Sequence, residues 1–201
     1  MKINTKQKIF EVSAELFSKE GYNGITMREI ARAAGIKESS IYNHYKNKEE
    51  ILESLFDYLS DTLTAYRPSD EEISKMLDFM SVEEVFKQLI IRFGTSLNGI
   101  LDSIVRIVYI EQFRNERAKK LMLESLLAEP ARYIEKVLRI MKEKDLIREI
   151  DIEMVAAEYN YTLLAITFEY AHAVISKEET APIIRKMFRH VAFICEYLKL
   201  N

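Results

Sequence analysis

Apolar residues recur at helical spacing along most of the chain. Ile9, Val12, Leu16 and Phe17 form the first such stripe, which begins near residue 4 and ends before Gly21. Similar stripes predict later helices at about 48–66, 70–78, 82–97, 100–113, 116–127, 130–144, 152–175 and 180–198. The pairs with capping spacing at helix starts are Ser69/Glu72, Ser81/Glu84 and Ser176/Glu179. Only five Gly and three Pro occur in 201 residues, so we predict an all-α fold.

One stretch allows a second interpretation. The residues ILDSIVRIVYIEQF at 100–113 are apolar almost all round, and their β-branched core favours a strand by propensity. No hairpin signal and no partner strand accompany this stretch, so we predict a helix there.

Residues 26–45 carry the signals of two short helices joined by a turn. Thr26 and Glu29 have the spacing of a capping box, in which each side chain bonds the backbone amide of the other. Gly35 stands where a helix C-terminus needs a left-handed residue, and a second helix follows at about 38–45 with Ile41 toward the core. Two such helices are a helix-turn-helix, whose second helix enters the major groove of DNA.

The charges are divided unevenly along the chain. Residues 1–48 hold nine Lys/Arg and five Asp/Glu, a balance of +4, whereas residues 49–201 hold twenty and twenty-seven, a balance of −7. The basic surplus therefore coincides with the helix-turn-helix, as phosphate binding requires.

Three sequence stretches in this region resemble one known family. They are ELFSKEGY at 15–22, TMREIARAAGI at 26–36 and IYNHYKNKEEIL at 41–52. Residues 9–52 thus resemble the DNA-binding domain of the tetracycline-repressor (TetR) family. The resemblance implies a three-helix DNA-binding domain at 1–48 and a helical effector-binding and dimerisation domain at 49–201. It also implies a homodimeric transcriptional repressor that a small apolar or aromatic effector releases from operator DNA, although activation stays open.

The resemblance also assigns DNA contacts by position. It implies base-edge contacts from the short polar residues Ser39, Ser40 and Asn43. It implies backbone phosphate contacts from Tyr42, His44 and Lys48, with additions from Thr26, Arg28 and Lys37. Lys37 stands where the family often has a capping Ser, and Ser39 where it often has Gly, which leaves the start of the second helix open. Tyr42 and Tyr45 could instead fill the core, which we favour for Tyr45 alone.

Met, Phe and Tyr residues are frequent in the second part of the chain. Each one can be a core residue, but together with a few polar groups they also suit an adaptable cavity. The candidate ligand-binding residues are Phe86, Ile90, Phe93, Tyr109, Gln112, Phe113, Tyr133, Asn160, Tyr161 and Phe168. The last two helices also carry small and apolar residues that could pair with a second copy: Ala156, Ala157, Ala165, Ala173, Ile184, Met187, Val191 and Ile194.

Other classes of protein fit less well. No apolar run approaches the roughly 18 residues of a membrane span, no signal peptide is visible, and a single cysteine, Cys195, fits a reducing cytoplasm. Glu169 and His172 have the Glu-x-x-His spacing of di-iron bundles, but such a site needs a second motif and the chain has only three His. We therefore expect a cytoplasmic protein without catalytic residues, metal or cofactor. The rival readings are a helical-bundle enzyme and a helix-turn-helix interaction module without a ligand.

Overall fold

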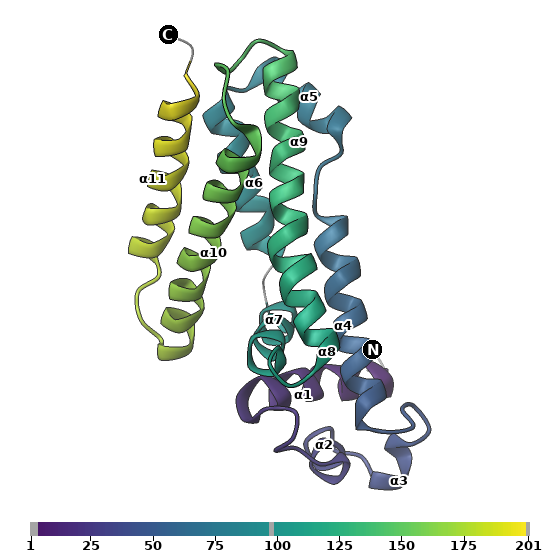
Figure 1. The fold of residues 1–201 in the computed structure, drawn as a ribbon. Helices are drawn as coiled ribbons and strands as arrows, with labels where there is room; N and C mark the ends of the chain where they lie inside the picture. Colours follow the sequence, from purple (N-terminus) through teal and green to yellow (C-terminus); the bar gives the residue numbers. More distant parts are fainter. Residues whose placement is uncertain (1–3, 97–98, 200–201) are drawn as a thin grey trace. The chain divides into compact units, whose positions relative to one another are not determined.

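The computed structural model describes residues 4–96 and 99–199, and every regular element among them is a helix (Figure 1). The helices are α1 (Thr5–Glu20), α2 (Met27–Ala33), α3 (Glu38–Ile41), α4 (Lys48–Ala65), α5 (Asp70–Phe79), α6 (Val82–Ser96), α7 (Ile100–Glu111), α8 (Glu116–Lys120), α9 (Glu129–Glu143), α10 (Ile152–Ser176) and α11 (Ala181–Leu198), with a π-helix at Leu121–Ala128. The all-α prediction is confirmed. Residues 97 and 98, where we expected the helix from residue 82 to end, lie outside the described residues. None of the described helices combines the length and the apolar character needed to cross a membrane.

The chain folds into two compact units. The first unit comprises residues 1–66 and 96–125, and the second comprises residues 67–95 and 126–201. Helices α4, α7 and α8 thus pack with the N-terminal helices, whereas the predicted division at residue 48 followed the DNA-binding motif alone. That division concerns function and stays a prediction.

Helix α7 forms the centre of the first unit. It packs along α1 and also contacts α4 and α8. Leu101, Ile104 and Val108 on α7 are each at most 1% exposed. The helix predicted at 100–113 is therefore confirmed to residue 111, because burial against several helices outweighs the strand propensity of its β-branched residues.

The second unit is built from α5, α6, α9, α10 and α11 around one apolar core. Phe86 of α6 packs its ring 4.9 Å from that of Tyr159 on α10. Ala156, Val191 and Ile194 also lie in this core. The prediction that these three residues face a second copy is therefore wrong: the chain's own helices cover them.

A π-helix replaces the second half of the α-helix predicted at 116–127. It lies directly before Pro130, which occupies the first turn of α9. A proline inside a helical run removes a backbone donor and crowds the carbonyl four residues earlier, here that of Leu126. A wider π-turn is one way in which a helix accommodates such a disturbance. The Asn160 side-chain amide also donates to the carbonyl of Leu127 at 3.2 Å.

The predicted capping pairs have mixed outcomes. Ser69 and Glu72 form the predicted capping box at α5, and Ser81 and Glu84 bond each other's backbone amides at the start of α6. The cap predicted from Ser176 and Glu179 is wrong. Residue 176 still belongs to α10, which ends on Lys177 in the left-handed conformation with φ 57°.

Candidate nucleic-acid interface

Helix α2 begins with the predicted capping box. The hydroxyl of Thr26 accepts from the amide of Glu29 at 3.3 Å, and the amide of Thr26 donates to the Glu29 carboxylate at 2.8 Å. The hydrogen bond from the Thr26 side chain is the main reason that the pKa of Glu29 lies below its ordinary value. Thr26 and the neighbouring Arg28 are both exposed, so they can still meet a phosphate.

Helix α3 is a single turn, from Glu38 to Ile41. Lys37 is its N-cap residue and makes no side-chain capping bond, which settles the start of the helix. The predicted continuation to residue 45 is wrong as regular helix, although the amide of Tyr45 still bonds the carbonyl of Ile41 at 3.0 Å. The turn therefore stays compact through residue 45.

The side chains of residues 37–45 divide between the core and the surface. Ile41 and Tyr45 are buried, at 0% and 3% exposure, which confirms the core role of Tyr45. Tyr42 is 50% exposed. Lys37, Ser39 and Asn43 are exposed as well, while Ser40 and His44 are half-buried. Among residues 37–45, the structure thus leaves most of the predicted base-edge and phosphate residues exposed, while Ile41 and Tyr45 are buried.

Lys48 has partners within the protein that the sequence did not indicate. Its ammonium group donates to the carbonyls of Tyr22 and Ile25, at 2.8 Å each, and lies 4.2 Å from the centroid of the Tyr22 ring. An ammonium group has three N–H donors, so one is left for a phosphate. Lys48 therefore fixes the turn between α1 and α2 besides its predicted role on DNA.

Tyr22, in that turn, is bound from several sides. Its amide donates to the Glu111 carboxylate of α7 at 2.9 Å, and its hydroxyl donates to Glu49 of α4 at 2.7 Å. Its ring meets that of Phe17 edge to face at 5.4 Å. Burial, followed by the bond to Glu49, raises the pKa of Tyr22 above its ordinary value.

Sequence reasoning missed Glu111, although a signal was present. Glu111 is only 5% exposed. It follows Ile104 and Val108 at helical spacing, so a carboxylate stands on the apolar stripe of α7. A charged group on such a stripe needs a partner.

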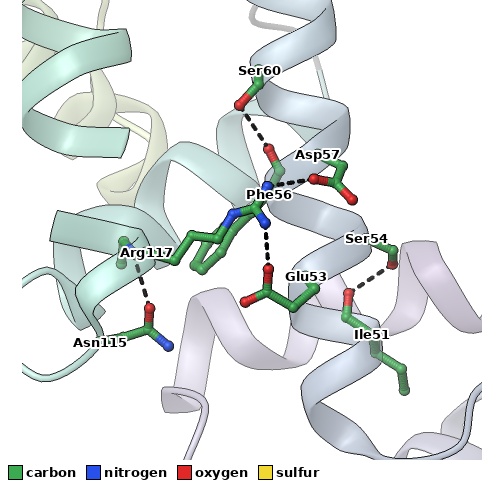
Figure 2. A network of polar contacts seen from close by, with 9 residues as sticks. Ile51, Glu53, Ser54, Phe56, Asp57, Ser60, Asn115 and Arg117 are labelled. Atoms are coloured by element: carbon green, nitrogen blue, oxygen red, sulfur yellow. Dashed lines mark hydrogen bonds and ion pairs between the residues drawn. The ribbon is translucent and has the colours of Figure 1, made fainter. Parts of the chain in front are cut away.

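A second polar cluster connects α8 to α4 (Figure 2). Asn115 accepts from the amide of Ala118 and so caps α8. The guanidinium of Arg117 then reaches α4, where it bonds Glu53 at 2.6 Å and also bonds Asp57. The two carboxylates lie one turn apart on α4, so a cation between them removes their mutual repulsion.

The candidate ligand residues on α7 and just beyond it lie in the first unit. Tyr109 is half-buried, and burial raises its pKa to about 12. The side-chain amide of Gln112 donates to the Tyr109 carbonyl at 3.1 Å, and Phe113 is 89% exposed.

The other candidate ligand residues lie in the second unit, where several have structural partners. Phe86 belongs to the core, and Ile90 and Tyr133 pack against it. The hydroxyl of Tyr133 donates to the Pro68 carbonyl, while Asn160 bonds Leu127 as described above. The remaining members are less buried: Phe168 is half-buried, and Phe93 and Tyr161 are exposed.

A surface hollow lies elsewhere on the second unit. It has a volume of about 380 Å³ and is lined by residues of α6 and α11, namely Glu84, Lys87, Gln88, Ile91 and Phe188. None of these is a candidate ligand residue. The assignment of the ligand-binding residues therefore stays a prediction.

The Glu-x-x-His pair does not meet further ligands. Glu169 bonds Lys186, and His172 is exposed in the single chain. Among the described residues, no three His, Cys, Asp or Glu side chains gather where they could hold a metal ion. His190 is half-buried, and its Nε2 lies 3.3 Å from the Tyr159 carbonyl oxygen.

Comparisons with known proteins identify the family. The family described as "Bacterial regulatory proteins, tetR family" matches residues 9–55. The biofilm operon negative transcriptional regulator IcaR of Staphylococcus epidermidis is 32% identical over 108 residues, which cover 49% of this chain and 58% of that protein. The match thus spans less than two thirds of this relative.

Solved structures show that the likeness in fold extends over most of the chain. The fatty acid degradation regulator FadR from Bacillus halodurans has a TM-score of 0.65 at 18% identity, covering 95% of this chain and 96% of that one. The TetR family transcriptional regulator PfmR from Thermus thermophilus has a TM-score of 0.62 at 19% identity, covering 94% and 97%. Residues 9–55 thus match the TetR family of bacterial regulatory proteins, and the chain shares its fold with solved regulators.

Proposed function

We propose that this protein is a DNA-binding transcriptional repressor that leaves its operator when a small apolar or aromatic molecule binds. The observation that carries the proposal is the α3 segment, where Ser39, Tyr42 and Asn43 are exposed while Ile41 and Tyr45 anchor the segment from behind. A short, rigid segment with exposed polar side chains suits the reading of base edges in a major groove. The name of the relative IcaR, a negative transcriptional regulator, supports repression.

The repressor acts as a homodimer through α10 and α11. A helix-turn-helix of this kind reads two half-sites related by a two-fold axis. Large apolar side chains stay exposed on both helices, among them Tyr161 at 55% and Phe193 at 70%. Such surface is unusual unless a partner covers it. Light scattering of the pure protein should give twice the chain mass at micromolar concentration, and a monomer would remove this part of the proposal.

The effector is an apolar or aromatic molecule. The fold is shared with FadR, whose name refers to fatty acid degradation, so fatty acids are the first compounds to screen. A ligand that binds one conformation better than another shifts the population toward it. Thermal shift with fatty acids and aromatic compounds should identify a stabilising ligand, and the same ligand should lower the affinity for DNA.

The DNA assignment is tested on a duplex that the protein itself selects. Selection from a random duplex pool with the full chain gives a bound sequence, and binding is then measured on that duplex and on a random one at several salt concentrations. Asn43→Ala should cost about 1–3 kcal/mol on the selected duplex and little on the random one. Arg28→Ala should weaken binding to both and flatten the salt dependence by about one unit per half-site.

Lys136→Ala is the matched control, because Lys136 is exposed on α9 of the second unit. This variant should bind both duplexes like the unmodified protein. If Asn43→Ala lost affinity equally on both duplexes, base reading by Asn43 would be refuted. If the selection enriched no sequence, operator recognition itself would fall.

A further inference from the structure

The turn between α1 and α2 is held by two opposite charges from different helices. Glu111 at the end of α7 accepts from the Tyr22 amide at 2.9 Å. Lys48 at the start of α4 donates to the Tyr22 carbonyl at 2.8 Å. An anion and a cation thus bind the N–H and the C=O of one residue, so hydrogen bonds join the turn to both α7 and α4.

The corner between α7 and α8, at residues 111–115, connects these contacts to α4. The backbone carbonyl of Glu111 accepts from the amides of Arg114 and Asn115, at 2.9 Å each, which makes the corner tight. Two residues after Asn115, Arg117 bonds Glu53 and Asp57 on α4 (Figure 2). The corner therefore bonds both the α1–α2 turn and the helix that carries Lys48.

Burial makes the hydrogen bond between Glu111 and Tyr22 costly to break. Glu111 is 5% exposed, and its carboxylate lies beside Gly21, where an added Cβ would stand 3.6 Å from Oε1. A buried carboxylate that loses its donor is strongly disfavoured. We therefore expect a displacement of α7 to move the turn with it.

We propose that Glu111 is a positioning residue of the DNA-binding surface: it holds the α1–α2 turn, and through it Lys48, in the geometry that meets a phosphate. The inference rests on the proposed function. It adds a route by which α7 controls DNA binding inside the first compact unit. This route does not depend on the distance between the two helix-turn-helix motifs of the proposed dimer. The route begins two residues beyond Tyr109, one of the candidate ligand residues.

The test compares Glu111→Leu, which removes the acceptor, with Glu111→Gln, which keeps a side-chain oxygen at nearly the same place. Both are made in the unmodified chain and in a Lys48→Met background. Affinity for a short duplex of mixed sequence is measured at low salt. Glu111→Leu should weaken binding about 10-fold, and Glu111→Gln should restore it to within about 2-fold. In the Lys48→Met background, Glu111→Leu should cost no more than about 2-fold further, because the two residues act as one unit.

Hydrogen exchange resolved to single amides gives a second readout that needs no DNA. The Tyr22 amide should be protected in the unmodified protein and should exchange about 10-fold faster or more in Glu111→Leu. If Glu111→Leu does not fold, the protection of Tyr22 in the unmodified protein and in Glu111→Gln still decides the matter.

Three results would overturn the inference: an unprotected Tyr22 amide, unchanged DNA affinity in Glu111→Leu, or full additivity with Lys48→Met. Failure of the unmodified chain to bind any duplex would instead overturn the proposed function, and the exchange measurement would then show by itself whether Glu111 holds the turn.

Discussion

Replacing Lys48 with methionine separates the two roles that the structure gives this side chain. Methionine keeps the length and apolar body of lysine but cannot donate to the carbonyls of Tyr22 and Ile25, which lie 2.8 Å from the ammonium group. The variant should therefore lose stability even without DNA. It should also lose affinity for every DNA sequence, because a phosphate contact carries no base information.

The size of the stability loss follows from the contacts. Hydrogen bonds that involve a charged group are worth about 1.5–3 kcal/mol each, and a cation over an aromatic ring adds about 0.5–1 kcal/mol at an exposed site. Lys48 is half-buried, so water replaces part of what is lost. We therefore expect a decrease in the free energy of unfolding of about 2 kcal/mol. For a chain of this length the decrease corresponds to a melting temperature lower by about 4–8 °C.

The assay is urea unfolding followed by circular dichroism, at one fixed protein concentration because the proposed dimerisation would make stability depend on concentration. Lys46→Met is the matched control, since Lys46 is exposed two residues earlier. If Lys48→Met unfolded at the same urea concentration as this control, the bonds to the turn would contribute nothing and the structural role would be refuted. An unchanged salt dependence of DNA binding would refute the phosphate role separately.

Three further predictions concern other contacts. Arg117→Leu should lower the free energy of unfolding by about 1 kcal/mol, a modest value because the ion pairs are partly exposed. In urea unfolding, the double variant Glu53→Gln/Arg117→Leu should lose less stability than the sum of the two single losses. Full additivity would contradict the pairing. Burial lowers the pKa of His190, so the folded protein binds fewer protons than the unfolded chain. The stability that His190 contributes should be complete above the unfolded pKa of about 6.5 and should be lost as the pH falls through the lowered folded pKa. In thermal-shift measurements at several pH values, His190→Phe should make the melting temperature depend less on pH in that range. Burial raises the pKa of the Cys195 thiol to about 12, so an aromatic disulfide reagent at pH 8 should label it only after unfolding, and rapid labelling of the native protein would refute this.

Local signals in the sequence predicted local structure well. The capping boxes at Thr26/Glu29 and Ser69/Glu72 were found in the structure with both bonds formed, because each depends only on residues three apart. Predicting a helix at 100–113 required more than residue propensity, which favoured a strand there. The argument from missing partner strands gave the right result there.

Most contacts between residues far apart in the sequence could not be predicted. The bond between Glu111 and Tyr22 joins residues 89 positions apart, and the charges of Lys48 and Glu111 gave no hint of a shared partner. Lys48 was assigned to DNA by resemblance alone, and its internal bonds become visible only when α4 lies beside the turn. The widened helix before Pro130 was missed because the sequence pattern of a π-helix is that of an α-helix over so short a length.

The candidate ligand residues show a different limit. Aromatic and thioether side chains serve equally in a packed core and in a cavity wall, so their frequency could not separate Phe86, a core residue, from Tyr161, an exposed one. Only the backbone path determines which of them share a space.

The way in which the chain alternates between its two compact units bears on protein engineering. The chain passes from one unit to the other after residues 66, 95 and 125, so the unit that contains the helix-turn-helix is made of two separate segments. A chimera that exchanged only the N-terminal segment would combine a foreign α1–α2 turn with the native α7 and α8. Such a hybrid should recover DNA binding, the proposed activity, only when residues 96–125 are exchanged together with residues 1–66. The stretch around Glu111 and Arg117 would then have to be transferred together with the helix-turn-helix.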